Sequence, residues 1–246
     1  LIKQPISPGD VIQTAAEAKA EEKMLTGDPA AARVKYFAER PWLKAIADDD
    51  DKSDPMSAWQ RHRRGKVTSS AAGALADPES QSKAMHNLLK GALTPINDPV
   101  TIQRGSIWTK SGDALEPVAL DWYRKNVDPN AFEPGLIFNR NKEGQATTPD
   151  AIADGGRRNV EVKSRNKFID PANPLDQNEA KTLRKNYLQM QHQMYLTGAS
   201  STDLIEIIRD PENPNAPLGK NGLNDNNIRK RRVDRDDELI RQMRPQ

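Results

Sequence analysis

The sequence lacks residue types that whole classes of active site require. Cysteine is absent, which excludes disulfides, thiolate nucleophiles, iron–sulfur clusters and cysteine-ligated zinc. Histidine occurs only three times, as His62, His86 and His192, so a multi-histidine metal site is not expected. A metal bound here would be a hard ion with oxygen ligands, such as magnesium or manganese.

Long apolar runs and a strong net charge are missing as well. No stretch approaches the ~18 consecutive apolar residues of a membrane-spanning helix, and the opening LIKQPISPGD has no signal-peptide pattern. We therefore expect a soluble, cytoplasmic protein with no membrane partner. The net charge of +2 does not by itself point to nucleic acid, although basic residues cluster locally, as in RHRRGK (61–66) and RKRR (229–232).

The 246 residues fit one domain with extended arms. Residues 1–56 are predicted to form a helical N-terminal arm, with helices over 10–25 and 29–40 and an acidic linker over 48–54. Within the linker, DDDDK (48–52) is also the enteropeptidase recognition sequence. An engineered origin for it stays open, and it is left out of the functional argument.

Residues 57–210 are predicted to form the core. Helices are expected over 82–92, 104–126 and 179–197, and strands over 135–139, 146–153, 159–164 and 203–210. This order predicts an α/β fold in which helices flank a central mixed β-sheet. Residues 211–246 read as a Pro/Asn-rich loop followed by a basic C-terminal helix around 225–243.

Three charged residues flank the sequence DGGR (154–157), namely Asp150, Glu161 and Lys163. If Gly155 and Gly156 form a two-residue turn, residue 150 faces residue 161, and the alternation of a strand places Lys163 on the same face. Opposed carboxylates repel unless a positive group lies between them. A divalent cation would satisfy both acids, and the lysine could orient a water nucleophile.

The same spacing also fits a solvated hairpin with an ordinary Glu161–Lys163 charge pair. The spacing alone does not decide between the two interpretations.

Five short segments strengthen the first interpretation. In chain order they are RRGKVTSS (63–70), GDALEPVA (112–119), TTPDAI (147–152), VEVKSR (160–165) and YLQMQHQMYLTG (187–198). In their residues and in their order along the chain, these segments resemble the motifs of the phage lambda exonuclease-like family (viral recombinase, alkaline exonuclease) of the PD-(D/E)xK nuclease superfamily. The resemblance covers roughly residues 59 to 208 and implies a restriction-endonuclease-like core.

The resemblance assigns roles to individual residues. Asp150 and Glu161 match the metal-binding carboxylates, the backbone carbonyl of Val162 a further ligand, and Lys163 the catalytic lysine. Glu116 matches a helical glutamate at the edge of the site, often linked to the metal through water.

Four other positions also match the family. Gln189 matches the active-site glutamine of the late helix. Arg63, Ser70 and Thr148 fall where the family holds the terminal 5′-phosphate of its substrate strand. A well-known member has serine at the position of Thr148.

Several of these assignments have structural alternatives. Asp113 and Glu116 have the spacing of a capping box at a helix start, with Pro117 just inside. Gln191 could be the working glutamine in place of Gln189, and His192 is expected to pack rather than act as a base. Residues 68–70 could cap a helix, which is compatible with phosphate binding.

The resemblance implies a Mg²⁺-dependent 5′→3′ exonuclease, in which Mn²⁺ can substitute. It would degrade one strand of linear duplex DNA to 5′-mononucleotides and leave a 3′ single strand for a recombination annealing protein. Family analogy implies a homo-oligomer, a trimeric ring, in the host cytoplasm if a phage encodes the chain.

Two alternatives remain. One is a structure-specific or restriction-type endonuclease of the same fold, which would cut closed circles. The other is a non-catalytic DNA-binding module, in which one or more of Asp150, Glu161 and Lys163 would be replaced. All three residues are present here.

Overall fold

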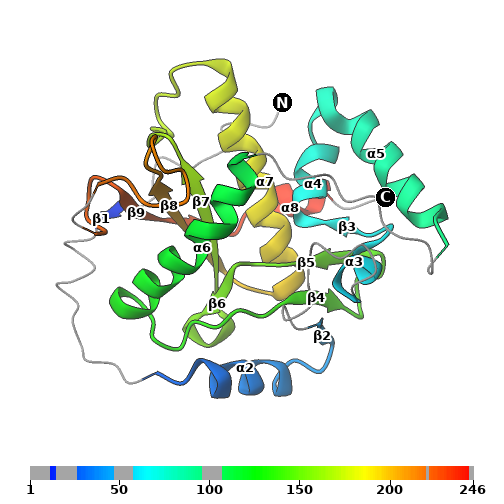
Figure 1. Ribbon diagram of the computed structural model, residues 1–246. Helices are drawn as coiled ribbons and strands as arrows, with labels where there is room; N and C mark the ends of the chain where they lie inside the picture. Colours follow the sequence, from blue (N-terminus) through cyan, green and yellow to red (C-terminus); the bar gives the residue numbers. More distant parts are fainter. Residues whose placement is uncertain (1–11, 15–26, 47–57, 96–106, 220–221, 244–246) are drawn as a thin grey trace.

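The computed structural model describes residues 12–14, 27–46, 58–95, 107–219 and 222–243 (Figure 1). The larger of two sheets has five strands in the order β1 (Ile12–Thr14), β9 (Ile228–Asp234), β8 (Ser201–Ile208), β7 (Arg158–Arg165) and β6 (Ala151–Ala153). Strands β7 and β8 are parallel and the other neighbours are antiparallel. The predicted α/β fold with a mixed sheet is confirmed.

A second sheet of four strands lies beside the first. Its order is β2 (Leu43–Ile46), β4 (Leu136–Asn139), β5 (Gln145–Thr147) and β3 (Val67–Thr68), with β3 parallel to β5. The single central sheet that the sequence suggested is therefore divided in two.

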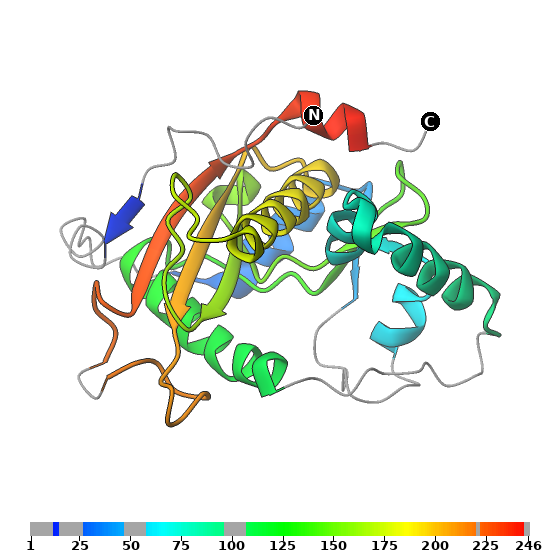
Figure 2. The same ribbon diagram turned by 90° about the horizontal axis from the view of Figure 1, so that it is seen from above.

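Helices α6 (Ile107–Asn126) and α7 (Gln177–Thr197) lie on either side of β7 (Figures 1 and 2). On one face, Leu115 and Ala119 of α6 pack with Val160 and Val162 of β7. On the other face, Met190 of α7 packs with residues of β8 and β9. Odd-numbered polar residues of β7 consequently point toward α7 while its valines fill the core.

Three helices come first in the predicted core over residues 57–210. They are α3 (Ala58–Arg63), α4 (Ser69–Leu75) and α5 (Pro78–Leu93). Thr68 caps α4 by accepting a hydrogen bond from the backbone N–H of Ala71 at 3.4 Å, so the capping interpretation of residues 68–70 is confirmed at Thr68. Gly73 lets α4 approach α7 closely, because a Cβ at this position would lie 3.1 Å from the carbonyl oxygen of Lys185.

Helix α2 (Pro29–Ala38) confirms the predicted helix over 29–40 and covers the turn between β6 and β7. Its Tyr36 packs with Phe132 and Ile152. None of the helices in the described part of the chain combines the length and apolar character that a bilayer span requires.

The predicted strand over 146–153 is wrong in one respect. The chain forms β5 in one sheet and β6 in the other, and residues 148–150 connect them. Pro149, which has no backbone N–H for a sheet hydrogen bond, lies at this change of sheet and interrupts the strand pattern. The switch matters because it places Asp150 at the point where the two sheets meet.

The turn after β6 also differs from the prediction. It is a short 3₁₀ turn over Asp154–Gly156, with positive φ at Asp154 (52°), Gly155 (61°) and Gly156 (94°). Ala151 nevertheless pairs with Val160, which is the predicted register, and Asp150 lies one residue beyond this last pair.

Two predicted helices are wrong within the described residues. Residues 12–14 of the expected helix over 10–25 form strand β1, and the remainder lies outside the described residues, as does the acidic stretch 48–54. The expected helix over 225–243 is strand β9 followed by α8 (Asp237–Met243). The basic run joins the sheet because its side chains pair with two buried acids of β8, Asp203 and Glu206.

The tail after residue 210 therefore contributes a strand to the main sheet. The proposed division of the chain into arm, core and tail otherwise stays a prediction.

Candidate active site

Asp150 lies just beyond the last residue pair of β6 and β7. Its backbone N–H donates to the carbonyl of Val160 at 3.1 Å, and its Oδ2 accepts from the N–H of Val162 at 2.6 Å. The carboxylate thus takes the place that the next residue of β6 would have occupied. It is held against the backbone of β7 rather than left free in solvent.

The carbonyl of Val162 points toward the same place. In a strand, the N–H and C=O of one residue project to the same edge, and the N–H of Val162 points to Asp150. Because the β6–β7 pairing ends at Ala151 and Val160, this carbonyl projects beyond the end of β6. It is well placed to serve as an oxygen donor beside the carboxylate.

Glu161 is buried and surrounded by donors from two elements. Its Oε1 accepts from the ammonium of Lys163 and from Nε2 of Gln189 at 2.6 Å. Its Oε2 accepts from Nε2 of Gln193 at 2.5 Å. Strand β7 supplies the lysine and helix α7 supplies both amides, so the carboxylate is fixed from two directions.

The charges at this site are strongly coupled. Burial raises the pKa of Asp150 well above its ordinary value, and the negative charges of Glu161 and Glu116 raise it further. Burial would lower the pKa of Lys163, but the attraction of Glu161 and Asp150 outweighs that effect and raises it. The lysine stays protonated, and the acids favour any cation that enters between them.

Glu116 belongs to this group through its charge, and the capping-box interpretation of it is wrong. Helix α6 begins at Ile107, so Asp113, Glu116 and Pro117 all lie inside the helix. A capping box requires the first of these residues to precede the helix. The negative charge of Glu116 contributes to the raised pKa of Asp150, and its role at the edge of the site stays a prediction.

The donor set suits a hard divalent cation. Among the described residues, no three His, Asp or Glu side chains converge closely enough to hold a metal by themselves. Two carboxylates and the Val162 carbonyl offer three oxygen donors, and magnesium commonly completes its coordination with water. The excess of acid over lysine here also calls for a cation.

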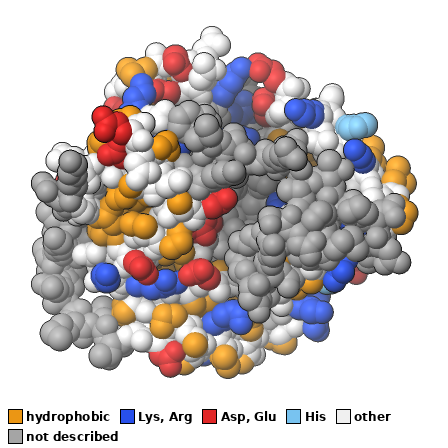
Figure 3. Space-filling model, in the orientation of Figure 1, with side chains coloured by type: hydrophobic (Ala, Val, Ile, Leu, Met, Phe, Trp, Pro, Cys, Tyr) orange, Lys and Arg blue, Asp and Glu red, His pale blue; other side chains and the backbone are white. Residues whose placement is uncertain are grey.

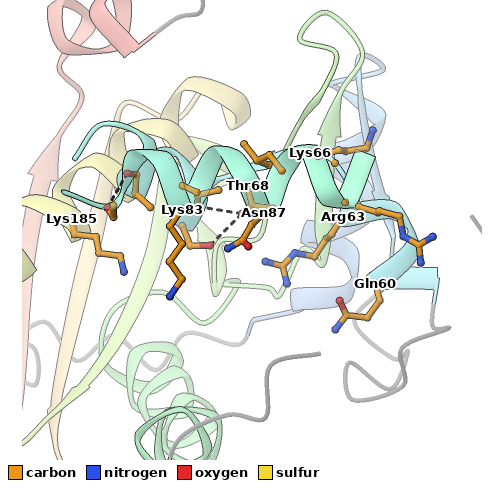
Figure 4. A pocket seen from close by; sticks show the side chains of 16 residues that line it. Gln60, Arg63, Lys66, Thr68, Lys83, Asn87 and Lys185 are labelled. Carbon is orange, nitrogen blue, oxygen red and sulfur yellow. Dashed lines mark hydrogen bonds between the residues drawn. The ribbon is translucent and has the colours of Figure 1, made fainter. Parts of the chain in front are cut away.

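Arg63 and Ser70 lie together in a second region, as predicted. Both line a cavity of about 510 Å³ that extends between α3, α4 and α5 toward Lys185 of α7 (Figure 4). Among the described residues that line it, none is acidic, and Lys66 and Lys83 add positive charge. Figure 3 shows Asp and Glu side chains near the middle of the face seen in Figure 1, whereas Lys and Arg side chains are scattered over this face.

The guanidinium of Arg63 lies 4.0 Å from the centroid of the Trp59 ring, which supports it from one side. Ser70 is exposed, and its hydroxyl lies 3.2 Å from that of Thr68.

Thr148 is not among the residues that line this cavity. It follows Thr147, whose hydroxyl lies 2.7 Å from the hydroxyl of Ser69. The structure therefore brings the chain at Thr148 close to the start of α4, between the cavity and Asp150, without placing its side chain in the lining.

The hydrogen bonds favour Gln189 over Gln191 as the glutamine of the site, because Gln189 donates to Glu161. Gln191 donates to the carbonyl of Asp234 and accepts from the N–H of Asp236, both at 2.8 Å. It therefore joins α7 to the end of β9 and takes no part in the site. Gln193 was missed, although it lies four residues after Gln189 and hence on the same face of the helix.

His192 is buried, as expected of a packing residue. Its Nδ1 lies 3.0 Å from the hydroxyl of Ser69, and its Nε2 lies 2.9 Å from Oε1 of Gln145. Burial, with a smaller contribution from Lys142, lowers the pKa of His192 to about 4. The imidazole is neutral at physiological pH.

Two crystal structures of an alkaline exonuclease (LHK-Exo) from Laribacter hongkongensis are similar to this chain. Each is 25% identical and covers 75% of this chain and 85% of the other; the TM-scores are 0.54 and, for the complex with dAMP, 0.55. A phage-related exonuclease from Haemophilus somnus gives 16% identity, a TM-score of 0.48 and coverage of 72% and 88%. No curated protein matches the chain.

The profile of the YqaJ-like viral recombinase domain matches residues 58–200. This span is more than half of the chain and contains Asp150, Glu161 and Lys163, the glutamines of α7 and the cavity lined by Arg63 and Ser70. With the likeness to the alkaline exonuclease, it shows that the protein is a nuclease and that the chain belongs to the YqaJ-like viral recombinase family.

Proposed function

We propose that this nuclease is a Mg²⁺-dependent 5′→3′ exonuclease that hydrolyses one strand of linear duplex DNA to 5′-mononucleotides. The observation that carries the proposal is the pairing of two sites. A partly buried acid–lysine cluster lies at the end of β6, and a cation-lined cavity with Arg63 and Ser70 lies beside it. Hydrolysis requires the first site, and a preference for one end of a strand requires the second.

Asp150, Glu161 and the carbonyl of Val162 would hold the ion. Magnesium, or manganese in its place, would polarise the scissile phosphate and lower the pKa of a bound water. Glu116 would contact the ion through water. Gln189 keeps Glu161 in position by its hydrogen bond to Oε1.

Lys163 is the cation that the protein itself provides at the reacting centre. Its ammonium, held by Glu161, can orient the attacking water and stabilise negative charge that develops on the phosphate. Because its pKa is raised by two neighbouring carboxylates, it remains a donor throughout the neutral range.

End recognition would come from Arg63 and Ser70. A guanidinium can grip two phosphate oxygens at once, and a hydroxyl near the start of α4 adds a further donor. Thr148 would complete this pocket on the side of Asp150. The similar protein LHK-Exo is an alkaline exonuclease whose structure was determined with dAMP, a mononucleotide.

The family resemblance supports further parts of the proposal. The 3′ single strand left behind would pass to an annealing protein of phage-type recombination. The chain would form a homo-oligomer, a trimeric ring by analogy, and would work in the host cytoplasm.

One gel tests the proposed activity. Linear duplex with 5′-phosphate ends is incubated beside closed circular duplex, each with magnesium and with EDTA. We expect mononucleotides from the linear DNA in magnesium and no product in the other lanes. Cutting of the circle would favour a restriction-type endonuclease, and hydrolysis in EDTA would contradict the metal site.

The recognition of the 5′ end is tested with two linear duplexes that differ only in whether the 5′ end carries a phosphate. Wild-type protein should degrade 5′-phosphorylated duplex faster than 5′-hydroxyl duplex, by about tenfold or more if one charge-assisted contact of ~1.5–3 kcal/mol is lost. Arg63→Ala should remove the difference. An equal slowing of both substrates, with the preference retained, would make Arg63 a plain backbone contact.

A further inference from the structure

A buried polar chain runs between the two proposed sites. It begins at Gln145, continues through the ring of His192 to the hydroxyl of Ser69, and ends at the hydroxyl of Thr147. The three contacts measure 2.9, 3.0 and 2.7 Å. Ser69, Thr147 and His192 are all buried, so water does not readily replace a partner that is lost.

The hydrogen-bond roles in this chain are mutually consistent. The side-chain oxygen of Gln145 can only accept, so Nε2 of His192 carries the proton and Nδ1 accepts from Ser69. Ser69 in turn accepts from the hydroxyl of Thr147. Each group therefore has one assigned role, and a neutral imidazole is the form that fits them.

Three of the four members of the chain, Ser69, Thr147 and His192, lie near a functional residue in the sequence. Ser69 precedes Ser70 of the cation-lined cavity, and Thr147 precedes Thr148 on the segment that leads to Asp150. On α7, His192 lies between Gln189 and Gln193, the two residues that hold Glu161. One imidazole thus joins the helix that orients the metal ligand to the helix that carries the phosphate contacts.

Backbone packing leaves this junction little freedom. At Gly73 the two helices approach so closely that an added Cβ would lie 3.1 Å from the carbonyl oxygen of Lys185. Tight packing sets the separation of α4 and α7, whereas directional hydrogen bonds set how far one helix slides along the other. His192 provides the bond to Ser69 at this interface.

We propose that His192 is a positioning residue that sets the offset between the 5′-phosphate cavity and the carboxylate site, and thereby the selectivity for phosphorylated ends. The inference rests on the proposed function. A phosphate held in the cavity fixes the scissile bond over Asp150 and Glu161 only if the two sites keep one spacing. A misplacement of ~1 Å can cost about a hundredfold in rate.

The competing account is that His192 only fills space in the core. The two accounts differ in the ratio of rates on 5′-phosphorylated and 5′-hydroxyl duplex. Loss of packing alone lowers the stability of the protein and slows hydrolysis of both substrates by the same factor. A changed spacing between the cavity and the carboxylate site slows mainly the 5′-phosphorylated duplex, because only that substrate uses both sites.

The experiment compares three neighbouring variants. His192→Leu keeps the bulk and removes both hydrogen bonds. His192→Asn keeps an acceptor at the place of Nδ1, since its Oδ1 lies at the same branch of the side chain. Gln191→Leu is the control, because it removes two buried hydrogen bonds of the same helix that lead to β9.

We expect His192→Leu to lower the rate ratio by about tenfold, within the range for a sub-ångström shift. His192→Asn should restore most of the ratio, and Gln191→Leu should lower Tm and leave the ratio unchanged. Ser69→Ala should act like His192→Leu, and serves if that variant does not fold.

A ratio that survives in both His192→Leu and Ser69→Ala would overturn the inference and leave the proposed function intact. A fall in the ratio for Gln191→Leu equal to that for His192→Leu would reduce His192 to a packing residue. A wild type without any preference would instead contradict end recognition, and the inference with it.

Discussion

Lys163 owes its place to strand β7 and its charge to the acids beside it. The strand carries it to the same face as Glu161, and Glu161 and Asp150 hold the ammonium in its protonated form. A lysine fixed in this way contributes mainly where negative charge develops during the reaction. Its removal should therefore affect turnover more than binding.

We expect Lys163→Ala to lower the single-turnover rate by roughly 10²–10³-fold, as for other electrostatic contacts in active sites. The Kd for DNA, measured in EDTA, should change little. Lys163→Arg should rescue little, because a planar guanidinium does not replace a compact ammonium. Wild-type kinetics in both variants would show that Lys163 is an ordinary solvated partner of Glu161.

Asp150 and Glu161 test the metal site directly. Asp150→Asn and Glu161→Gln keep the shape of each side chain but remove a charged ligand, which should abolish hydrolysis in magnesium and weaken Mg²⁺ binding measured by calorimetry. If either variant keeps more than about a tenth of the wild-type rate, a loss of only ~1.4 kcal/mol, the metal site lies elsewhere.

The sequence predicted these residues better than it predicted their partners. The spacing of Asp150, Glu161 and Lys163 could be converted to positions because a strand alternates with period two. Gln193 could have been found, because it lies four residues after Gln189 on the same face of α7, but the bond of His192 to Ser69 depends on the angle and separation of α4 and α7. No local pattern encodes that geometry.

At the scale of elements, the turn between β6 and β7 determines the register that places Asp150 one residue beyond the last pair of these strands. Gly155 and Gly156 both have positive φ, but their surroundings differ. Nothing lies within 4 Å of a Cβ at Gly155, whereas a Cβ at Gly156 would lie 2.5 Å from ring carbons of Tyr36. Helix α2 thus packs directly on the turn.

The two glycines form a matched pair for substitution. Gly155→Ala should cost about 1–2 kcal/mol, the penalty of a left-handed conformation. Gly156→Ala adds a steric clash, worth a further ~1–3 kcal/mol of overpacking, and should displace α2. Urea unfolding of both variants gives the comparison. Equal losses of unfolding free energy in the two variants would mean that α2 moves aside without a free-energy penalty and does not constrain the turn.

The same elements show where sequence reasoning ends. The helices over 29–40 and 179–197 could be predicted with the help of Pro29 at the start of the first and Gly198 at the end of the second, and the structure has both. Pro149 marks a break between β5 and β6, but no local pattern tells that the two strands belong to different sheets. The basic run 229–232 was expected in a helix and lies in strand β9, where its side chains pair with buried acids of β8.

At the scale of the molecule, β9 shows how a basic tail becomes part of the core. Its Arg229 and Arg231 lie 2.7 and 3.4 Å from Glu206 of β8, which Arg165 of β7 also contacts at 2.5 Å. Burial alone would raise the pKa of Glu206, but the three arginines outweigh it and lower that pKa. One acid therefore joins three neighbouring strands.

This arrangement makes Glu206 more important to the fold than its single charge suggests. Glu206→Gln would leave three guanidinium groups without their counter-ion, and breaking a buried ion pair costs about 3–5 kcal/mol. The matched control is Glu133→Gln, which removes a surface pair with Arg124 (2.7 Å) and should cost no more than about 1 kcal/mol. The free energy of unfolding, from urea titration at neutral pH, gives both values.

The same pair predicts a dependence on pH. The pKa of Glu206 is lower in the folded protein than in the unfolded chain, so its charge stabilises the fold at a pH above the unfolded pKa. This stabilisation is lost as the pH falls through the folded pKa, so the difference in unfolding free energy between wild type and Glu206→Gln should shrink in acid. A difference that stays constant from neutral pH to the acid limb, or a loss no larger than that of Glu133→Gln, would show that β9 is held by its backbone ladder and not by the acid at its centre.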